Sequence, residues 1–178
     1  MYQGIIMSGF GGQGIVSGGI MLAYAGMMDG RNVTFFPAYG AEMRGGTANC
    51  SVVLSTDPVA SPVVGNPDTI LVMNEPSLAR FEPSLKQAGL LFLNTSLVVS
   101  KPTRTDVTVL EVPASDIAKE LGNIKAANMV MLGAYAKKTG VVKIKTLKDS
   151  IKKVYARATD KMVETNKKAL DRGAAVVG

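Results

Sequence analysis

Short apolar segments, each bounded by Gly, Pro, Asn or Asp, recur along the first two thirds of the chain. Their length and their content of β-branched residues are typical of buried β-strands. Small and apolar residues also occupy nearly every position from Ile15 to Met28, which predicts a well-packed helix directly after the first strand. We predict about six strands, which span Tyr2–Ser8, Asn32–Pro37, Asn49–Ser55, Thr69–Met73, Leu90–Asn94 and Asp106–Val112.

A short helix is predicted over Pro76–Gln87, with a proline near its start and Gly89 just past its end. A helix that connects two neighbouring strands makes those strands parallel, so we expect parallel pairing of Thr69–Met73 with Leu90–Asn94. The last third of the chain is helical in pattern, with Gly122, Gly140 and Gly173 as stop signals. The four predicted helices span Ala114–Leu121, Ala126–Lys138, Leu147–Arg157 and Asp160–Asp171.

This alternation of strands and helices predicts an α/β fold with a helical C-terminal region. The chain shows no internal repeat and no linker long enough to separate two domains, so residues 1–178 are predicted to form a single domain. With 178 residues, of which 47% are hydrophobic, the chain is large enough to bury its own core. General disorder is therefore excluded.

The residue types restrict the chemistry. The sequence has one Cys and no His, which excludes disulfide scaffolds, zinc fingers, Cys-ligated iron–sulfur clusters and His-based catalysis within this chain. Cys50 lies in a predicted strand and is interpreted as a small buried hydrophobe rather than as a reactive thiol. We expect no catalytic residue and no metal ligand here.

The net charge of +6 is unevenly distributed along the chain. Residues 1–100 carry 4 basic and 6 acidic groups, whereas residues 101–178 carry 16 basic and 8 acidic groups. Because acidic residues and few aromatics accompany these lysines, a solvated surface is favoured over nucleic-acid binding, with attraction to an acidic partner as the second interpretation. No signal peptide or long apolar run is present, so a cytoplasmic protein without membrane contact is expected.

A glycine-rich loop connects the first strand to the first helix. The segment Gly9–Gly14 matches G-x-G-x-x-G in the strand-to-helix context where it binds phosphate or carboxylate groups. A nicotinamide dinucleotide is disfavoured, because neither Asp29 nor Glu42 stands at the end of the second strand, where the ribose-binding acid belongs. The other open interpretation is that the glycines allow close packing and face a partner chain. The candidate residues are Gly9, Gly11, Gly12, Gln13 and Gly14.

A second polar loop lies between the second and third strands, within Pro37–Cys50. Arg44 offers a planar set of donors that suits a carboxylate or phosphate, and Gly45 and Gly46 permit a close approach of the backbone. A local ion pair between Glu42 and Arg44 is the alternative.

These motifs together resemble one family, the gamma subunits of the 2-oxoacid:ferredoxin (acceptor) oxidoreductases. The resemblance extends from about residue 4 to about residue 173, and several motifs in the same order are more specific than any one of them. They are Gly9–Gly14, Tyr39–Thr47, Ser61-Pro62, Asn66–Asp68, Glu120–Asn123 and Asn128–Gly133.

The resemblance implies one subunit of an enzyme that oxidatively decarboxylates a 2-oxoacid with coenzyme A (CoA) and reduces ferredoxin. It also implies a three-layer α/β/α fold with a mixed sheet. In that family thiamine diphosphate, magnesium and the iron–sulfur clusters belong to the alpha, beta and delta subunits. The sequence agrees, because a single Cys cannot build a cluster and the family's Gly-Asp-Gly thiamine signature is absent.

The role expected of this chain is architectural, with a share in the CoA site through the phosphates. The loop Tyr39–Thr47 looks most like versions that act on 2-oxoglutarate or branched-chain 2-oxoacids, with pyruvate next. Two alternatives are a free-standing nucleotide-binding regulatory module that uses the glycine loop and a purely structural interaction domain.

Overall fold

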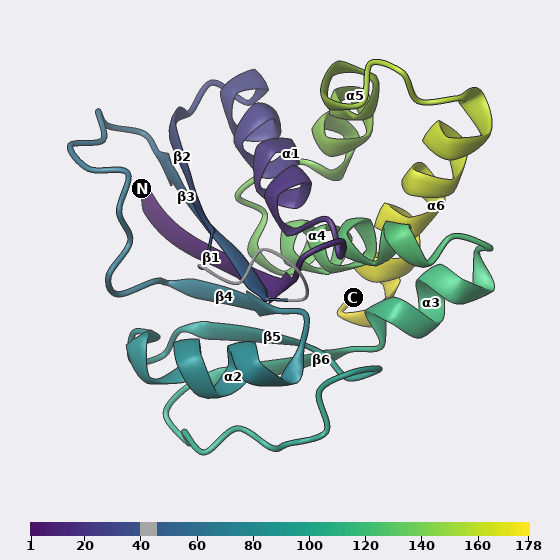
Figure 1. Cartoon of the computed structure of the whole chain (residues 1–178). Helices are drawn as coiled ribbons and strands as arrows, with labels where there is room; N and C mark the ends of the chain where they lie inside the picture. The colour runs from purple at the N-terminus through teal and green to yellow at the C-terminus, as the bar shows by residue number, and fades with distance from the viewer. Residues whose placement is uncertain (40–45) are drawn as a thin grey trace.

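The computed structural model describes residues 1–39 and 46–178, apart from the side chain of Tyr39. In this part of the chain, six strands form one sheet in the order β2-β3-β1-β4-β5-β6 (Figure 1). The strands are β1 (Tyr2–Phe10), β2 (Asn32–Tyr39), β3 (Thr47–Ser55), β4 (Thr69–Val72), β5 (Leu90–Asn94) and β6 (Thr108–Val112).

The sheet is mixed. β1, β4, β5 and β6 are parallel, and β3 runs antiparallel between β1 and β2. Ile6 of β1, for example, lies opposite Ile70 of β4 on one side and Ser51 of β3 on the other. The predicted parallel pairing of the strands on either side of the Pro76 helix is confirmed.

Six α-helices accompany the sheet in the described residues. They are α1 (Ile15–Met28), α2 (Glu75–Phe81), α3 (Ala114–Glu120), α4 (Ala127–Thr139), α5 (Ile144–Val154) and α6 (Asp160–Val176), with 3₁₀ turns η1 (Glu82–Ser84) and η2 (Ile124–Ala126). α2 lies on one side of the sheet, and the other helices lie on the opposite side (Figure 1). The expected three-layer α/β fold with a helical C-terminal region is therefore confirmed.

Each face of the sheet has its own apolar core. The larger one joins the sheet to α1 and to α4, which is buried along most of its length. At its centre, Tyr135 of α4 meets Phe92 of β5 edge to face, with ring centroids 6.1 Å apart. The smaller core lies beneath α2 and includes Ile70 and Leu78. Central strands that are buried on both faces account for the continuous apolar runs in the sequence.

The prediction that Gly173 ends the last helix is wrong. α6 continues to Val176, and Gly173 lies inside it against α4. A Cβ there would overlap the carbonyl group of Val130, and a Cβ on Gly133 would overlap that of Leu170. The two glycines thus let α4 and α6 cross at backbone contact, so their missing side chains serve packing and not termination. Gly140 does end α4, with φ of 63°.

Two other helices differ from the sequence prediction, since the Pro76 helix is shorter and α5 both begins and ends three residues earlier than Leu147–Arg157. The Pro76 helix ends at Phe81 and continues only as the η1 turn, before a further turn at Ala88 with φ of 59°. α5 begins earlier than predicted because Asp29 accepts hydrogen bonds from the Lys143 N–H (2.9 Å) and from Thr146 Oγ1 (2.8 Å). This carboxylate, 114 residues away in sequence, stabilises the first turn of α5.

Candidate functional site at the carboxyl edge of the sheet

The chain reverses its winding between β1 and β4. β1 leads through α1 on one face to β2 at one edge of the sheet, whereas β4 leads through α2 on the other face to β5. The carboxyl ends of β1 and β4 therefore border a topological switch point, which is where open α/β sheets bind ligands. The glycine-rich loop follows β1 at this point.

The glycines of this loop differ in what surrounds them. Gly9 is buried, and a Cβ there would lie 2.7 Å from Ile15 Cδ1 and 2.8 Å from Met73 Cβ. Gly11 and Gly12 are exposed, and no atom lies within 4 Å of a Cβ placed on either. Gly12 and Gly14 have positive φ values of 94° and 73°. Gly9 thus allows packing, while Gly11 and Gly12 leave their backbone accessible to another molecule.

Gln13 joins the ends of the two strands. Its Oε1 accepts a hydrogen bond from the Phe10 N–H (2.6 Å), and its Nε2 donates to the Met73 carbonyl (3.1 Å). Because Phe10 ends β1 and Met73 follows β4, this side chain fixes the loop across the switch point. Both the oxygen and the nitrogen of the Gln13 side-chain amide therefore hold the loop in position.

Asn128 of α4 holds the end of the glycine loop in place. Its side chain is 2% exposed, and its Nδ2 donates to the Gly14 carbonyl at 3.0 Å. A Cβ on Gly14 would lie 2.5 Å from the same nitrogen, so glycine is required for this contact. Asn128 does not cap α4, whose N-cap is Ala126. Its role is to connect α4 with the start of α1.

The second polar loop reaches the glycine loop. The Gly11 N–H donates to the Gly46 carbonyl at 3.2 Å, so two segments far apart in sequence meet here. Arg44 and Gly45, together with the predicted Glu42–Arg44 ion pair, lie outside the described residues.

A cavity of about 190 Å³ opens beside the glycine loop. Gly12 and Gln13 form one side, and the exposed side chain of Lys125 adds a positive charge. Leu97 and Ile124 add apolar surface. The cavity is lined by Gly12, Gln13, Leu97, Ser115, Ile124, Lys125 and Ala127. Such a lining suits a molecule with an anionic group and an apolar part.

Sequence reasoning missed Leu97, Ser115, Ile124 and Lys125 as lining residues. A signal for two of them was present, because Leu97 and Ser115 follow β5 and β6, whose carboxyl ends share this edge. Ser115 is fixed by Asn94, which donates to its Oγ (2.9 Å) and accepts from its N–H (3.2 Å). The position of Ile124 and Lys125 depends on the η2 turn, which no periodicity revealed.

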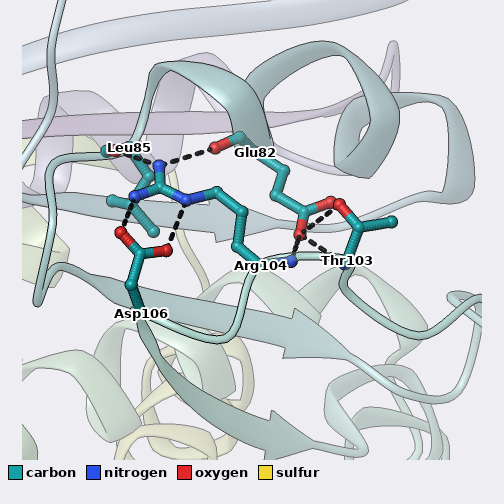
Figure 2. Close-up of polar contacts among 5 residues, drawn as sticks. All are labelled: Glu82, Leu85, Thr103, Arg104 and Asp106. Atoms are coloured by element: carbon teal, nitrogen blue, oxygen red, sulfur yellow. Dashed lines mark hydrogen bonds and ion pairs between the residues drawn. The ribbon is translucent and has the colours of Figure 1, made fainter.

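The long segment after β5, which carries Leu97, is held to the η1 turn at the end of α2 by the buried carboxylate of Glu82. Figure 2 shows Glu82 accepting hydrogen bonds from the N–H groups of Thr103 (2.6 Å) and Arg104 (2.8 Å). The Arg104 guanidinium makes two hydrogen bonds to Asp106 (2.8 and 2.5 Å) and also contacts the Leu85 carbonyl. Hydrogen bonding from Arg104 lowers the pKa of Asp106 below its ordinary value.

Glu75 anchors the same segment nearer the cavity. Its Oε2 accepts a hydrogen bond from the Val99 N–H at 2.8 Å. Hydrogen bonds from the Ser100 side chain and from the Val99 backbone lower the pKa of Glu75. The segment that positions Leu97 is therefore attached to the start of α2 through Glu75 and to the η1 turn that follows α2 through Glu82.

Cys50 is fully buried, and burial raises the pKa of its thiol to about 12. This agrees with its interpretation as a small hydrophobe.

Within residues 1–39 and 46–178, no group of three or more His, Cys, Asp or Glu residues is placed to hold a metal ion. In the same residues, no helix is long and apolar enough to cross a membrane.

The model of the family described as pyruvate ferredoxin/flavodoxin oxidoreductase matches residues 4–176. The chain belongs to this family. It is 38% identical over 170 residues to the ketoisovalerate oxidoreductase subunit VorA of Methanothermobacter marburgensis, covering 94% of this chain and 35% of that protein. It is 31% identical over 176 residues to the 2-oxoglutarate synthase subunit KorC of Methanocaldococcus jannaschii, covering 97% of this chain and 92% of that one. The chain thus spans about a third of VorA and nearly all of KorC.

Solved structures of this oxidoreductase family have the same fold. The gamma subunit of a keto/oxoacid ferredoxin oxidoreductase from Geobacter sulfurreducens matches with a TM-score of 0.87 and 27% identity, over 99% of this chain and 97% of that one. The 2-oxoglutarate:ferredoxin oxidoreductase from Magnetococcus marinus, with 2-oxoglutarate, CoA and succinyl-CoA bound, matches with a TM-score of 0.90 and 25% identity, over 99% of this chain and 31% of that one. The resemblance to gamma subunits is confirmed.

Proposed function

We propose that this chain is the gamma unit of an enzyme that oxidatively decarboxylates a 2-oxoacid with CoA. The products are an acyl-CoA and carbon dioxide, and the two electrons released pass to ferredoxin. Membership of the oxidoreductase family supports this proposal. The names of the relatives VorA and KorC favour a branched-chain 2-oxoacid or 2-oxoglutarate, with pyruvate next. The comparisons give no support to a free-standing nucleotide-binding module.

The redox groups are assigned to other parts of the enzyme. The chain has one Cys, which is buried, and its described residues offer no group of ligands for a metal ion. These residues do not fit an iron–sulfur cluster. We therefore assign the clusters, thiamine diphosphate and magnesium to alpha, beta and delta subunits in the cytoplasm, and ferredoxin to the acceptor role.

Within this assembly, we assign the glycine loop and the adjacent cavity to the phosphates of CoA. The observation that carries this is the meeting, at the switch point, of the exposed Gly12 backbone, the Lys125 ammonium group and the apolar walls of Leu97 and Ile124. The Gly12 backbone and the Lys125 ammonium group suit a phosphate of CoA. The apolar side chains of Leu97 and Ile124 suit its pantetheine chain. The Magnetococcus oxidoreductase, which matches over this whole unit, was solved with CoA bound.

Four residues around the cavity have separate roles in the proposed binding of CoA. Gln13 and Asn128 hold the loop in place, and Gly46 connects it to the second polar loop. Lys125 neutralises phosphate charge. The other loop positions in the proposed CoA site are Gly9, Gly11, Gly12, Gly14, Arg44 and Gly45.

The test is the kinetics of the assembled enzyme with varied CoA. In Gly12→Asp, a carboxylate repels phosphate and a side chain also strains the loop at a φ of 94°. In Lys125→Ala the cation is lost. We expect each to raise the KM for CoA about tenfold, the effect of one charge-assisted hydrogen bond. The KM for the 2-oxoacid should stay unchanged, and Lys138→Ala, which removes an exposed lysine of α4 outside the cavity lining, should change neither value. An unchanged KM for CoA in Gly12→Asp, Lys125→Ala and Arg44→Ala enzymes that assemble would overturn the assignment.

A further inference from the structure

Helix α1 has no charged residue on any of its faces. The segment Ile15–Met28 contains no Asp, Glu, Lys or Arg. Its inner side packs on the sheet through glycines, because a Cβ on Gly19 would overlap Cys50 Sγ and one on Gly26 would overlap the side chain of Leu54. The helix therefore approaches the sheet closely and has no polar face to turn toward water.

The outer side of α1 is apolar and exposed. Ile20, Tyr24 and Met27 follow one another at helical spacing, and Met28 adjoins them. Met27 is 60% exposed and Met28 is 48% exposed. We refer to Ile20, Tyr24, Met27 and Met28 as the α1 stripe. A helix that is apolar all round is normally buried, so the exposed stripe indicates a surface that another protein covers.

The neighbouring helices show that this is a local property. α5 lies beside α1 (Figure 1) and exposes more lysines than acids, namely Lys145, Lys152 and Lys153 against Asp149. α6 exposes both lysines and acids. The stripe is thus an uncharged surface bordered by a basic one. Tyr and Met are enriched in the centres of protein interfaces, and charged residues are depleted there.

We propose that the α1 stripe is the docking surface for the part of the oxidoreductase that corresponds to the other two thirds of VorA. This rests on the proposed function, because it takes the chain to work inside that enzyme. The same folded unit makes up 92% of KorC but 35% of VorA, so in VorA it is joined to a large further portion in one polypeptide. A permanent contact of that kind is more apolar than a transient one.

The chemistry of the partner surface follows from this setting. Its centre is apolar and uncharged, since a charge placed against Tyr24 and Met27 would lose water without gaining a counter-ion. Where it extends over α5, it carries acidic groups opposite the lysines. A second copy of this chain meets the first condition but not the second, because its own α5 would bring like charges together.

The experiment is co-expression of this chain with the polypeptides of the same organism that match the remaining two thirds of VorA, followed by native mass spectrometry and measurement of Kd. The variant is the double substitution Tyr24→Lys and Met27→Lys. We expect its Kd for the partner polypeptides to rise by about 30-fold or more, as for loss of a central interface residue.

Val63→Lys is the matched control, since Val63 is 61% exposed and Met27 is 60% exposed. This control should assemble like the wild type. Each isolated variant should still unfold cooperatively with a melting temperature within a few degrees of the wild type, because Met27 and Val63 are mostly exposed and Tyr24 is 37% exposed.

Three results would overturn the proposal. Undiminished assembly of the double variant would show that α1 is not the docking surface. A wild-type homodimer that the double variant loses would show that the stripe binds a second copy instead. Failure of the wild type to bind the partner polypeptides at all would contradict the proposed function as well. Since Gly12→Asp leaves the stripe intact, its assembly separates a failure at the CoA site from a failure of docking.

Discussion

α1 and the pair formed by α5 and α6 lie on the same side of the sheet (Figure 1). The side chains that they expose differ in chemistry. α1 exposes only apolar side chains. α5 and α6 expose ion pairs, among them Lys145–Asp149 at 2.6 Å and Lys152–Asp160 at 3.0 Å. The difference shows that charged side chains keep α5 and α6 stable in contact with water, whereas the exposed side of α1 has no charged group to do so. Much of the net charge of +6 lies in this region, because α5 and the turns around it contain more lysines than acidic residues.

The largest expected effect is on the inner side of α1. In Gly19→Val, the new side chain meets the half-buried Phe35 ring and Cys50, which is fully buried and cannot move away within the packed core. We expect a loss of about 3 kcal/mol in the free energy of unfolding, measured by urea denaturation. Ile20→Val, one residue along on the outer side, should change stability by less than about 0.5 kcal/mol. Equal losses in the two variants would remove the distinction between the faces of α1.

A smaller effect is expected where α1 meets α4. Asn128→Ala removes the amide that donates to the Gly14 carbonyl. The loss of this buried hydrogen bond should cost about 1 kcal/mol of stability, again by urea denaturation. It should also raise the KM for CoA in the assembled enzyme, because the glycine loop is no longer held. Asn66→Ala, at an exposed asparagine, is the control for both measurements. A destabilised Asn128→Ala enzyme with an unaltered KM for CoA would contradict the positioning role.

The smallest effect belongs to the charged helices. Hydrogen bonds from Lys152 and Lys167 lower the pKa values of Asp160 and Glu164. A lowered acid pKa stabilises the fold at neutral pH, and this contribution disappears as the pH falls through the lowered value. Lys152→Met with Lys167→Met should therefore lower the melting temperature slightly at neutral pH, and not at all in strong acid or high salt. A difference that persists in acid would show that these lysines stabilise by packing.

The fold followed closely from the sequence because its signals are local. Each predicted strand has a counterpart in the sheet, since runs such as Leu90–Asn94 are apolar on both faces and end at turn residues. Gly173 was misread because a glycine that ends a helix and one that allows helices to cross look the same in a single sequence. Only the approach of Val130 from α4 distinguishes the two. The start of α5 was missed for a similar reason, since it depends on distant Asp29.

The site was predicted in part. The loop Gly9–Gly14 was found because its motif is contiguous, and the structure places it at the switch point. Its contact with Gly46 joins the two predicted loops. Leu97 had a signal in its position after β5, but Lys125 could not be predicted, because its approach to Gly12 depends on how the η2 turn is held in three dimensions.

The Asp29 carboxylate, which joins the end of α1 to the start of α5, also sets the electrostatic boundary on this side of the molecule. Its two hydrogen bonds link the helix that carries the α1 stripe to the helix that carries the lysines. A partner that approaches α1 therefore meets a positive field at a constant position beside its apolar target. Its rate of association should depend on salt through that field, while the lifetime of the complex depends on the apolar contact. The hydrogen bonds of Asp29 to the first turn of α5 thus help to orient the partner before the apolar surfaces meet.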